Sequence, residues 1–121
     1  MIKMLFSGDK KKVKIKTEHF IIIMTFPKKM YMIQTYHIPV LLIAKEKMLN
    51  VEIDVYSLDD VRVRIEPDFI NLVDEGRGVK LDLVVSSDTK GKKKIVMKLS
   101  WNDAFYNKYS FERMIKMSFK I

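Results

Sequence analysis

The sequence lacks cysteine altogether and has only four glycines and three prolines in 121 residues. The missing cysteines exclude disulfide bonds, thiolate zinc sites and cysteine nucleophiles together, and they suit a reducing compartment. The chain also has no internal repeat and no low-complexity linker. A chain of this length can bury a core without covalent cross-links, so we expect a single domain over residues 1–121.

A long uninterrupted apolar run is absent as well. The most apolar stretch, Phe20 to Ala44, is broken by Pro27-Lys28-Lys29 and again by Pro39, whereas a membrane-spanning helix needs about 20 apolar residues in succession. Met1 to Phe6 is too short for the apolar region of a signal peptide and is soon followed by lysines. We therefore expect no membrane span and a cytoplasmic location.

Glutamine is nearly absent, since Gln34 is the only one, whereas lysine, isoleucine and valine are abundant. This usage is typical of proteins from hot habitats. Nine methionines favour the opposite, because methionine is thermolabile. The composition therefore leaves a thermophilic source open.

Side chains that could form a catalytic or metal centre are few. His19 and His37 are the only histidines, and catalysis needs a base beside a nucleophile or a metal with several ligands. The two could share a metal with Glu18 only if their strands pair. Asp59-Asp60 lacks the spacing of a calcium loop, and Glu75–Gly78 lacks the Gly-Lys-Ser/Thr of a phosphate loop. We expect no enzyme activity, no cofactor and no metal.

The dominant pattern is an alternation of apolar and polar residues, which predicts β-strands with one dry and one wet face. β-Branched residues are frequent at the apolar positions. The alternation predicts strands at 49–56, 61–66, 79–85, 94–101 and 114–121. Turn-forming residues separate them, and residues 102–108 predict a long hairpin loop.

The first third of the chain is less regular. Val13 to Phe26 predicts one long strand, and after a turn at Pro27-Lys28-Lys29 the segment Met30 to Ile38 returns as the second arm of an N-terminal hairpin. Pro39 is expected to break or bend the chain, because proline lacks the N–H that a sheet ladder uses. A strand at Val40 to Ala44 would follow. A short buried helix over residues 40–48 is the alternative.

The segment Phe20 to Phe26 is apolar and uncharged. A continuous apolar run fits a strand that is covered on both faces, and such a segment would promote aggregation if it were exposed. We therefore expect it to be buried, either in the core or against a partner.

From Pro39 onward, strands and turns follow in a definite order: a strand, an acidic turn, a strand that ends in Glu-Pro, a loop, an apolar strand, a glycine and a further strand. These are residues 51–55, 61–67, 79–85, Gly91 and 95–101. This order resembles an immunoglobulin-like β-sandwich of the kind found in prokaryotic and archaeal proteins, although the disulfide pair of antibody domains is absent. The resemblance implies an all-β, antiparallel sandwich of about seven to eight strands over residues 39–121, after a basic arm and hairpin over residues 1–38. It carries no functional residue.

Charge is divided along the chain. Residues 1–48 carry ten lysines and three acids, net +7; residues 49–89 carry four basic residues and ten acids, net −6; residues 90–121 carry nine basic residues and two acids, net +7. If the strands at 49–56 and 79–85 share one sheet and those at 61–66, 94–101 and 114–121 share the other, the second sheet has a basic outer face. Its basic residues would be Arg62, Arg64, Lys94, Lys98, Lys116 and Lys120.

The predicted basic face has three interpretations. Lysine and arginine on a wet face keep a strand soluble and discourage edge pairing. A basic face also attracts anions, including nucleic-acid phosphates, although no aromatic side chain interleaves with these positions as a stacking platform. In the third interpretation it meets the acidic face of another copy.

We expect a non-catalytic protein-interaction or structural module that acts within a larger assembly, with a protein partner or self-association. The alternative is a nucleic-acid-binding protein that uses the basic face. The run Lys90–Lys94 fits either a solvated hairpin tip or a nucleic-acid patch. The cluster Lys10–Lys16 could add a basic arm to the same anion-binding surface.

Overall fold

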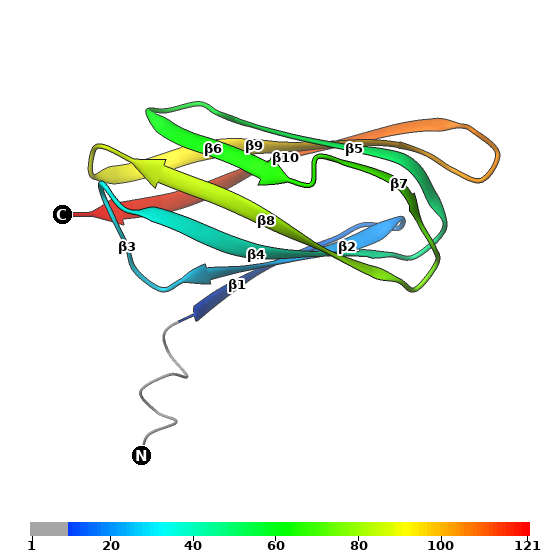
Figure 1. The fold of residues 1–121 in the computed structure, drawn as a ribbon, viewed down its shortest axis with the longest axis horizontal. Coiled ribbons are helices and arrows are strands. Elements are labelled where there is room, and N and C mark those ends of the chain that lie inside the picture. Colours follow the sequence, from blue (N-terminus) through cyan, green and yellow to red (C-terminus); the bar gives the residue numbers. More distant parts are fainter. Residues whose placement is uncertain (1–9) are drawn as a thin grey trace, which may run out of the picture.

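The computed structural model describes residues 10–121, in which all regular structure is β-strand (Figure 1). The ten strands are β1 (Lys10–Lys16), β2 (Phe20–Pro27), β3 (Met30–Tyr31), β4 (Thr35–Ala44), β5 (Met48–Ser57), β6 (Val61–Glu66), β7 (Phe69–Val73), β8 (Gly78–Ser87), β9 (Gly91–Asn102) and β10 (Lys108–Lys120). Residues 10–121 contain no helix that is long and apolar enough to cross a membrane.

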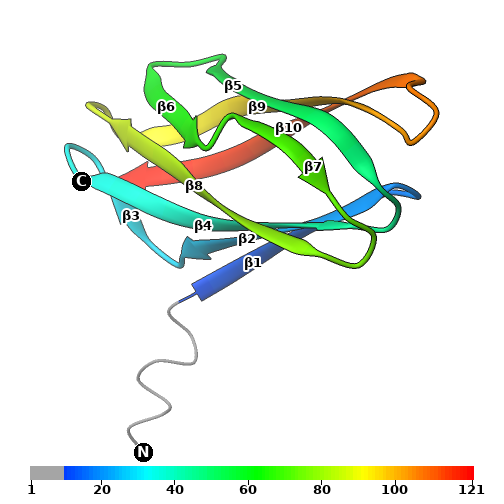
Figure 2. The same cartoon turned by 45° about the vertical axis from the view of Figure 1, so that its right-hand side comes forward.

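The strands form two five-stranded sheets that pack face to face (Figure 2). The order in the first sheet is β1-β2-β4-β8-β6, and the order in the second sheet is β3-β10-β9-β5-β7. Neighbours are antiparallel, except that the short strand β3 runs parallel to β10. The protein is therefore an immunoglobulin-like β-sandwich, as the order of strands and turns implied. Seven of its ten strands, β4 to β10, lie wholly or partly in residues 39–121, in agreement with the expected seven or eight.

Alternating side chains fill the space between the sheets. In β2, Phe20, Ile22, Met24 and Phe26 are buried, and the residues between them are half-buried. The segment 20–26 therefore has one face in the core and one partly covered outer face, rather than two buried faces. Trp101 is 3% exposed and packs edge-on against Phe20, with ring centroids 5.4 Å apart.

The predicted long strand over residues 13–26 is two strands, β1 and β2, that form a hairpin. The turn between them is held by Thr17, whose hydroxyl oxygen accepts hydrogen bonds from the backbone N–H groups of His19 at 3.1 Å and Phe20 at 3.0 Å. A hydroxyl that bonds the next backbone turn is a recognised turn former. This local contact divides a segment that the apolar pattern alone presents as continuous.

Pro39 does not break the chain, and no helix forms over residues 40–48. β4 runs through Pro39 from Thr35 to Ala44. The ladder to β2 ends at Val40, whereas pairing with β8 continues through Pro39, so the position tolerates a residue without an N–H. The boundary expected after residue 38 falls inside β4, and the hairpin is part of the first sheet.

The predicted division of strands between the sheets is wrong. β5 lies beside β9 in the second sheet, and β6 pairs with β8 in the first. Between β5 and β6 the chain crosses from the second sheet to the first. Asp59 and Asp60 stabilise this crossing, because they bond the backbone N–H of Lys94, at 2.7 Å, and the side chain of Lys93. The six predicted basic residues consequently do not share a face: Arg62 and Arg64 lie on the first sheet, and Lys94, Lys98, Lys116 and Lys120 lie on the second.

Candidate anion-binding groove

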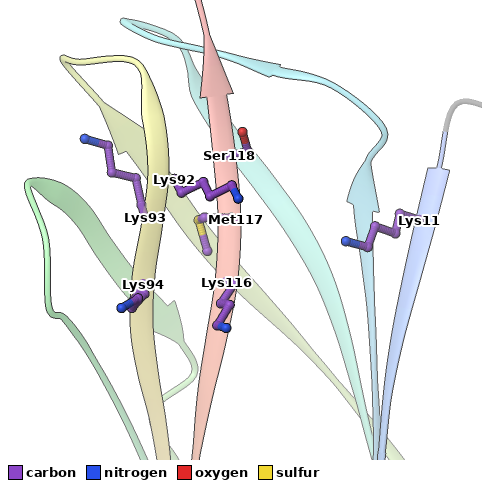
Figure 3. Close-up of a pocket in the computed structure, with 7 residues that line it drawn as sticks. All are labelled: Lys11, Lys92, Lys93, Lys94, Lys116, Met117 and Ser118. Atoms are coloured by element: carbon purple, nitrogen blue, oxygen red, sulfur yellow. The ribbon is translucent and has the colours of Figure 1, made fainter.

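A groove lined by lysines lies between β1, an edge of the first sheet, and β10, near an edge of the second (Figure 3). It consists of two adjoining hollows of about 310 and 90 Å³ that share Lys11, Lys116, Met117 and Ser118. The larger hollow is completed by Lys92, Lys93 and Lys94, and the smaller by Val13, Phe26, Pro27, Lys28 and Met30. Met117 is buried beneath the lysines.

Lys94 and Lys116 lie directly opposite each other on β9 and β10. The C=O of Lys94 accepts a hydrogen bond from Leu58, at 2.9 Å, on the side away from β10. Lys94 and Lys116 therefore form a non-hydrogen-bonded pair, in which opposite side chains are closest. Like charges in such a position destabilise a sheet. The described residues that line the groove include no acid, so an anion from outside would relieve this repulsion.

Lys93 differs from its neighbours because its charge is neutralised inside the protein. Its side chain is 7% exposed and donates hydrogen bonds to Asp60 and, at 2.6 Å, to the hydroxyl of Thr89. The hydrogen bond from Lys93 lowers the pKa of Asp60 from 3.8 to about 2. Lys93 therefore belongs to the structure of the strand crossing, whereas Lys92 and Lys94 remain exposed.

Arg62 and Arg64 are neutralised by local acids on the first sheet. Arg62 makes a bidentate ion pair with Asp88, with N–O distances of 2.8 and 3.0 Å, and Arg64 contacts Glu66 at 2.7 Å. The hydrogen bond from Arg62 lowers the pKa of Asp88, and the same bond raises the pKa of Arg62. These two arginines do not contribute to the groove.

Of the other predicted residues, Lys98 and Lys120 also lie outside the groove. Lys98 sits between Asp54 and Glu112 in the cross-strand register, and Lys120 lies at the end of β10 beside β3. Of the six predicted basic residues, only Lys94 and Lys116 line the groove. The groove also contains Lys92 from the run at 90–94 and, from the cluster at 10–16, Lys11 on β1, which lies across the groove from β10.

The two histidines do not line the groove, and they lie toward opposite ends of β4. His19 bonds Glu46 and packs against Tyr109, with ring centroids 4.8 Å apart. His37 bonds Asp82 at 2.7 Å, toward the opposite end of β4. They do not form the metal pair considered from the sequence, and residues 10–121 contain no cluster of three or more potential metal-ligating side chains of His, Cys, Asp or Glu.

Comparison with known proteins finds matches among solved structures only: no protein-family model and no curated protein matches the chain. It is similar to the GAE domain of GGA2p from Saccharomyces cerevisiae, with a TM-score of 0.70, 8% identity, and coverage of 89% of this chain and 96% of that one. It is also similar to SSP-19, an MSP-domain protein like family member in Caenorhabditis elegans (TM-score 0.50, 15% identity, 77% and 94% coverage). A FixG-related protein from Vibrio parahaemolyticus gives a TM-score of 0.51, 15% identity, and 93% and 98% coverage. At these identities the likeness establishes the immunoglobulin-like fold alone.

Proposed function

We propose that this protein is a non-catalytic interaction module within a larger assembly, and that its lysine groove binds an acidic segment of a partner protein. The observation that carries the proposal is the cross-strand pair Lys94–Lys116, which shares one hollow with Lys92 and Lys11. By contrast, the exposed Arg62 and Arg64 each have an acid beside them. A concentration of uncompensated lysines attracts anions and speeds their encounter.

The apolar surroundings of the groove favour a polypeptide over a nucleic acid. Val13, Phe26 and Met30 line the smaller hollow and suit the apolar side chains of a peptide. Binding of single-stranded nucleic acid commonly uses exposed aromatic rings beside the charge. The most exposed aromatic residues, Phe105 and Tyr106, lie in the β9–β10 loop at the opposite end of the sandwich (Figure 2).

The chemistry of the groove supports binding rather than catalysis. Its polar side chains are lysine amines and the hydroxyl of Ser118. A serine nucleophile needs an adjacent base to activate it. The described lining residues include neither a histidine nor a carboxylate, and the amine of the buried Lys93 bonds Asp60 and Thr89 instead of Ser118.

The test is fluorescence anisotropy with labelled poly-L-glutamate and, separately, labelled oligo(dT), each at low and high salt. We expect Lys94→Glu/Lys116→Glu to weaken poly-L-glutamate binding at least about tenfold, which corresponds to about 1.4 kcal/mol. The matched control is Lys45→Glu/Lys47→Glu, which changes the net charge equally in an exposed loop between β4 and β5. The control should bind within about twofold of the wild type.

Two results would contradict the proposal. Equal losses in both variants would mean that net charge alone attracts the polymer. Tighter binding of oligo(dT), lost only in the groove variant, would support the nucleic-acid alternative in its place.

A further inference from the structure

β10 has a free edge that borders the lysine groove. On one side it pairs with β9 along its whole length, from Lys108 to Phe119. On the other side β3 pairs only with Phe119 and Lys120. In the part of the chain that the structure describes, the middle of β10 therefore has no strand beside it on the groove side.

Two backbone hydrogen bonds identify the groups that face this free edge. The C=O of Lys120 accepts from the N–H of Met32 at 2.8 Å and therefore points away from β9. The bond between Lys94 and Leu58 independently places Lys116 in a non-hydrogen-bonded pair with β9. Because backbone direction alternates along an antiparallel strand, the even-numbered residues present both N–H and C=O to the edge. In the unpaired part they are Ser110, Glu112, Met114 and Lys116.

We propose that the acidic partner segment binds in an extended conformation, as an added β-strand on this edge of β10. This inference rests on the proposed function and specifies its mode of binding. An added strand gains main-chain hydrogen bonds from the edge, and its alternate side chains provide specificity. Its outward side chains would lie beside Lys116, with Lys94 one strand further away on β9, which selects acids. Its inward side chains would lie near the half-buried residues Val13 and Phe111, which selects apolar residues.

The charges on β10 favour such a partner over a second copy of the chain. β10 carries Lys108, Arg113, Lys116 and Lys120 against the single acid Glu112, so pairing of two β10 strands would bring net positive charges together. Arg113 occupies an inward position yet is exposed, with its guanidinium 5.6 Å from the centre of the Phe111 ring. Inward-pointing charges and lysines on an edge are known to discourage self-pairing. The same charges attract an acidic strand.

A pair of substitutions at Met114 tests the added strand. Met114 is 47% exposed and lies opposite Val96 in a non-hydrogen-bonded pair, so Met114→Pro removes a free-edge N–H without removing a bond to β9. The probe is a fluorescein-labelled peptide of alternating glutamate and valine, about ten residues long. We expect Met114→Pro to weaken its binding about tenfold or more, and Met114→Ala to stay within about twofold. Thermal unfolding of both variants checks that they fold.

A second measurement leaves the protein unchanged. The same peptide is prepared in two versions, one with N-methyl groups on the odd-numbered backbone amides and one with N-methyl groups on the even-numbered amides. Only half of the amides of a bound strand face β10. Methylation of that half should therefore abolish binding, and methylation of the other half should preserve it.

Equal binding of the two methylated peptides would contradict the added strand, whatever the effect of Met114→Pro on affinity. If the groove variant Lys94→Glu/Lys116→Glu then still loses binding, the proposed function stands and only its mode is wrong. If that variant also binds like the wild type, the proposed function itself fails.

Discussion

The outer face of β6 and β8 and the lysine groove both gather exposed cations, but they differ in what surrounds those cations. On β6, Arg62 and Arg64 each contact an acid within 3 Å. In the groove, Lys94 faces Lys116 across the ladder, with Lys92 and Lys11 nearby. A count of basic residues does not separate the two regions. The pairing of strands separates them, because it decides whether a cation meets an acid or another cation.

The two regions also differ in what they contribute to folding. Exposed ion pairs such as those of β6 stabilise a fold little. Like charges directly opposite each other reduce stability. An arrangement that opposes folding is typical of a surface whose purpose is binding, because natural sequences commonly lose some stability at functional sites. The like-charge pair therefore favours the groove as the binding site.

The largest effect is expected for Asp60→Asn. This change removes the counter-charge of the buried Lys93, and an unpaired buried charge destabilises strongly. We expect the thermal midpoint at neutral pH to fall by about 5–10 °C. Asp88→Asn, which removes only the exposed partner of Arg62, is the control and should change the midpoint little.

The pH dependence of the Asp60→Asn effect has a defined sign. Folding lowers the pKa of Asp60 from 3.8 to about 2, chiefly through the hydrogen bond from Lys93. The stabilisation is therefore complete above pH 3.8 and is lost as the pH falls toward 2. Thermal unfolding of wild type and variant across this range should converge at the acid end. A constant difference between them would contradict the ion pair.

A smaller effect of opposite sign is expected for Lys116→Glu. The substitution replaces a repulsive pair with Lys94 by an attractive one, so we expect the thermal midpoint to rise by about 1–3 °C while binding of the acidic peptide weakens. Lys45→Glu changes the net charge equally without such a partner and corrects for general repulsion. A fall in the midpoint would show that Lys94 and Lys116 do not repel each other in the folded state.

The smallest effect is expected for Arg62→Ala. Both Arg62 and Asp88 are exposed, and water already screens their attraction. Neither the thermal midpoint nor the affinity for the acidic peptide should change measurably. A clear loss of affinity in an anisotropy titration would mean that the binding surface extends to β6, which the present assignment excludes.

Much of the strand pattern was predictable because alternation is local. β6 coincides with the predicted strand 61–66, and the loop between β9 and β10 lies where it was predicted. β10 begins at Lys108 rather than residue 114. The exposed Arg113 at an inward position interrupts its apolar pattern, although Tyr109 and Phe111 continue it.

Strand partners were not predictable from the same pattern. Alternation tells which side chains point inward but not which sheet a strand joins. That choice depends on long-range contacts such as the hydrogen bond between Asp60 and Lys93, and the groove depends on β1 lying across it from β10. The candidate site consequently could be predicted only in part: Lys94 and Lys116 were identified, whereas Lys11 and Lys92 belonged to other clusters in the sequence.

The decisive measurement is an amide chemical-shift titration of the labelled protein with the alternating glutamate–valine peptide. We expect saturable shifts in β10 from Ser110 to Ser118 and at Lys11, with β6 unaffected. Shifts of equal size around Arg62 and Arg64, or shifts spread evenly over all exposed lysines, would contradict binding in the groove.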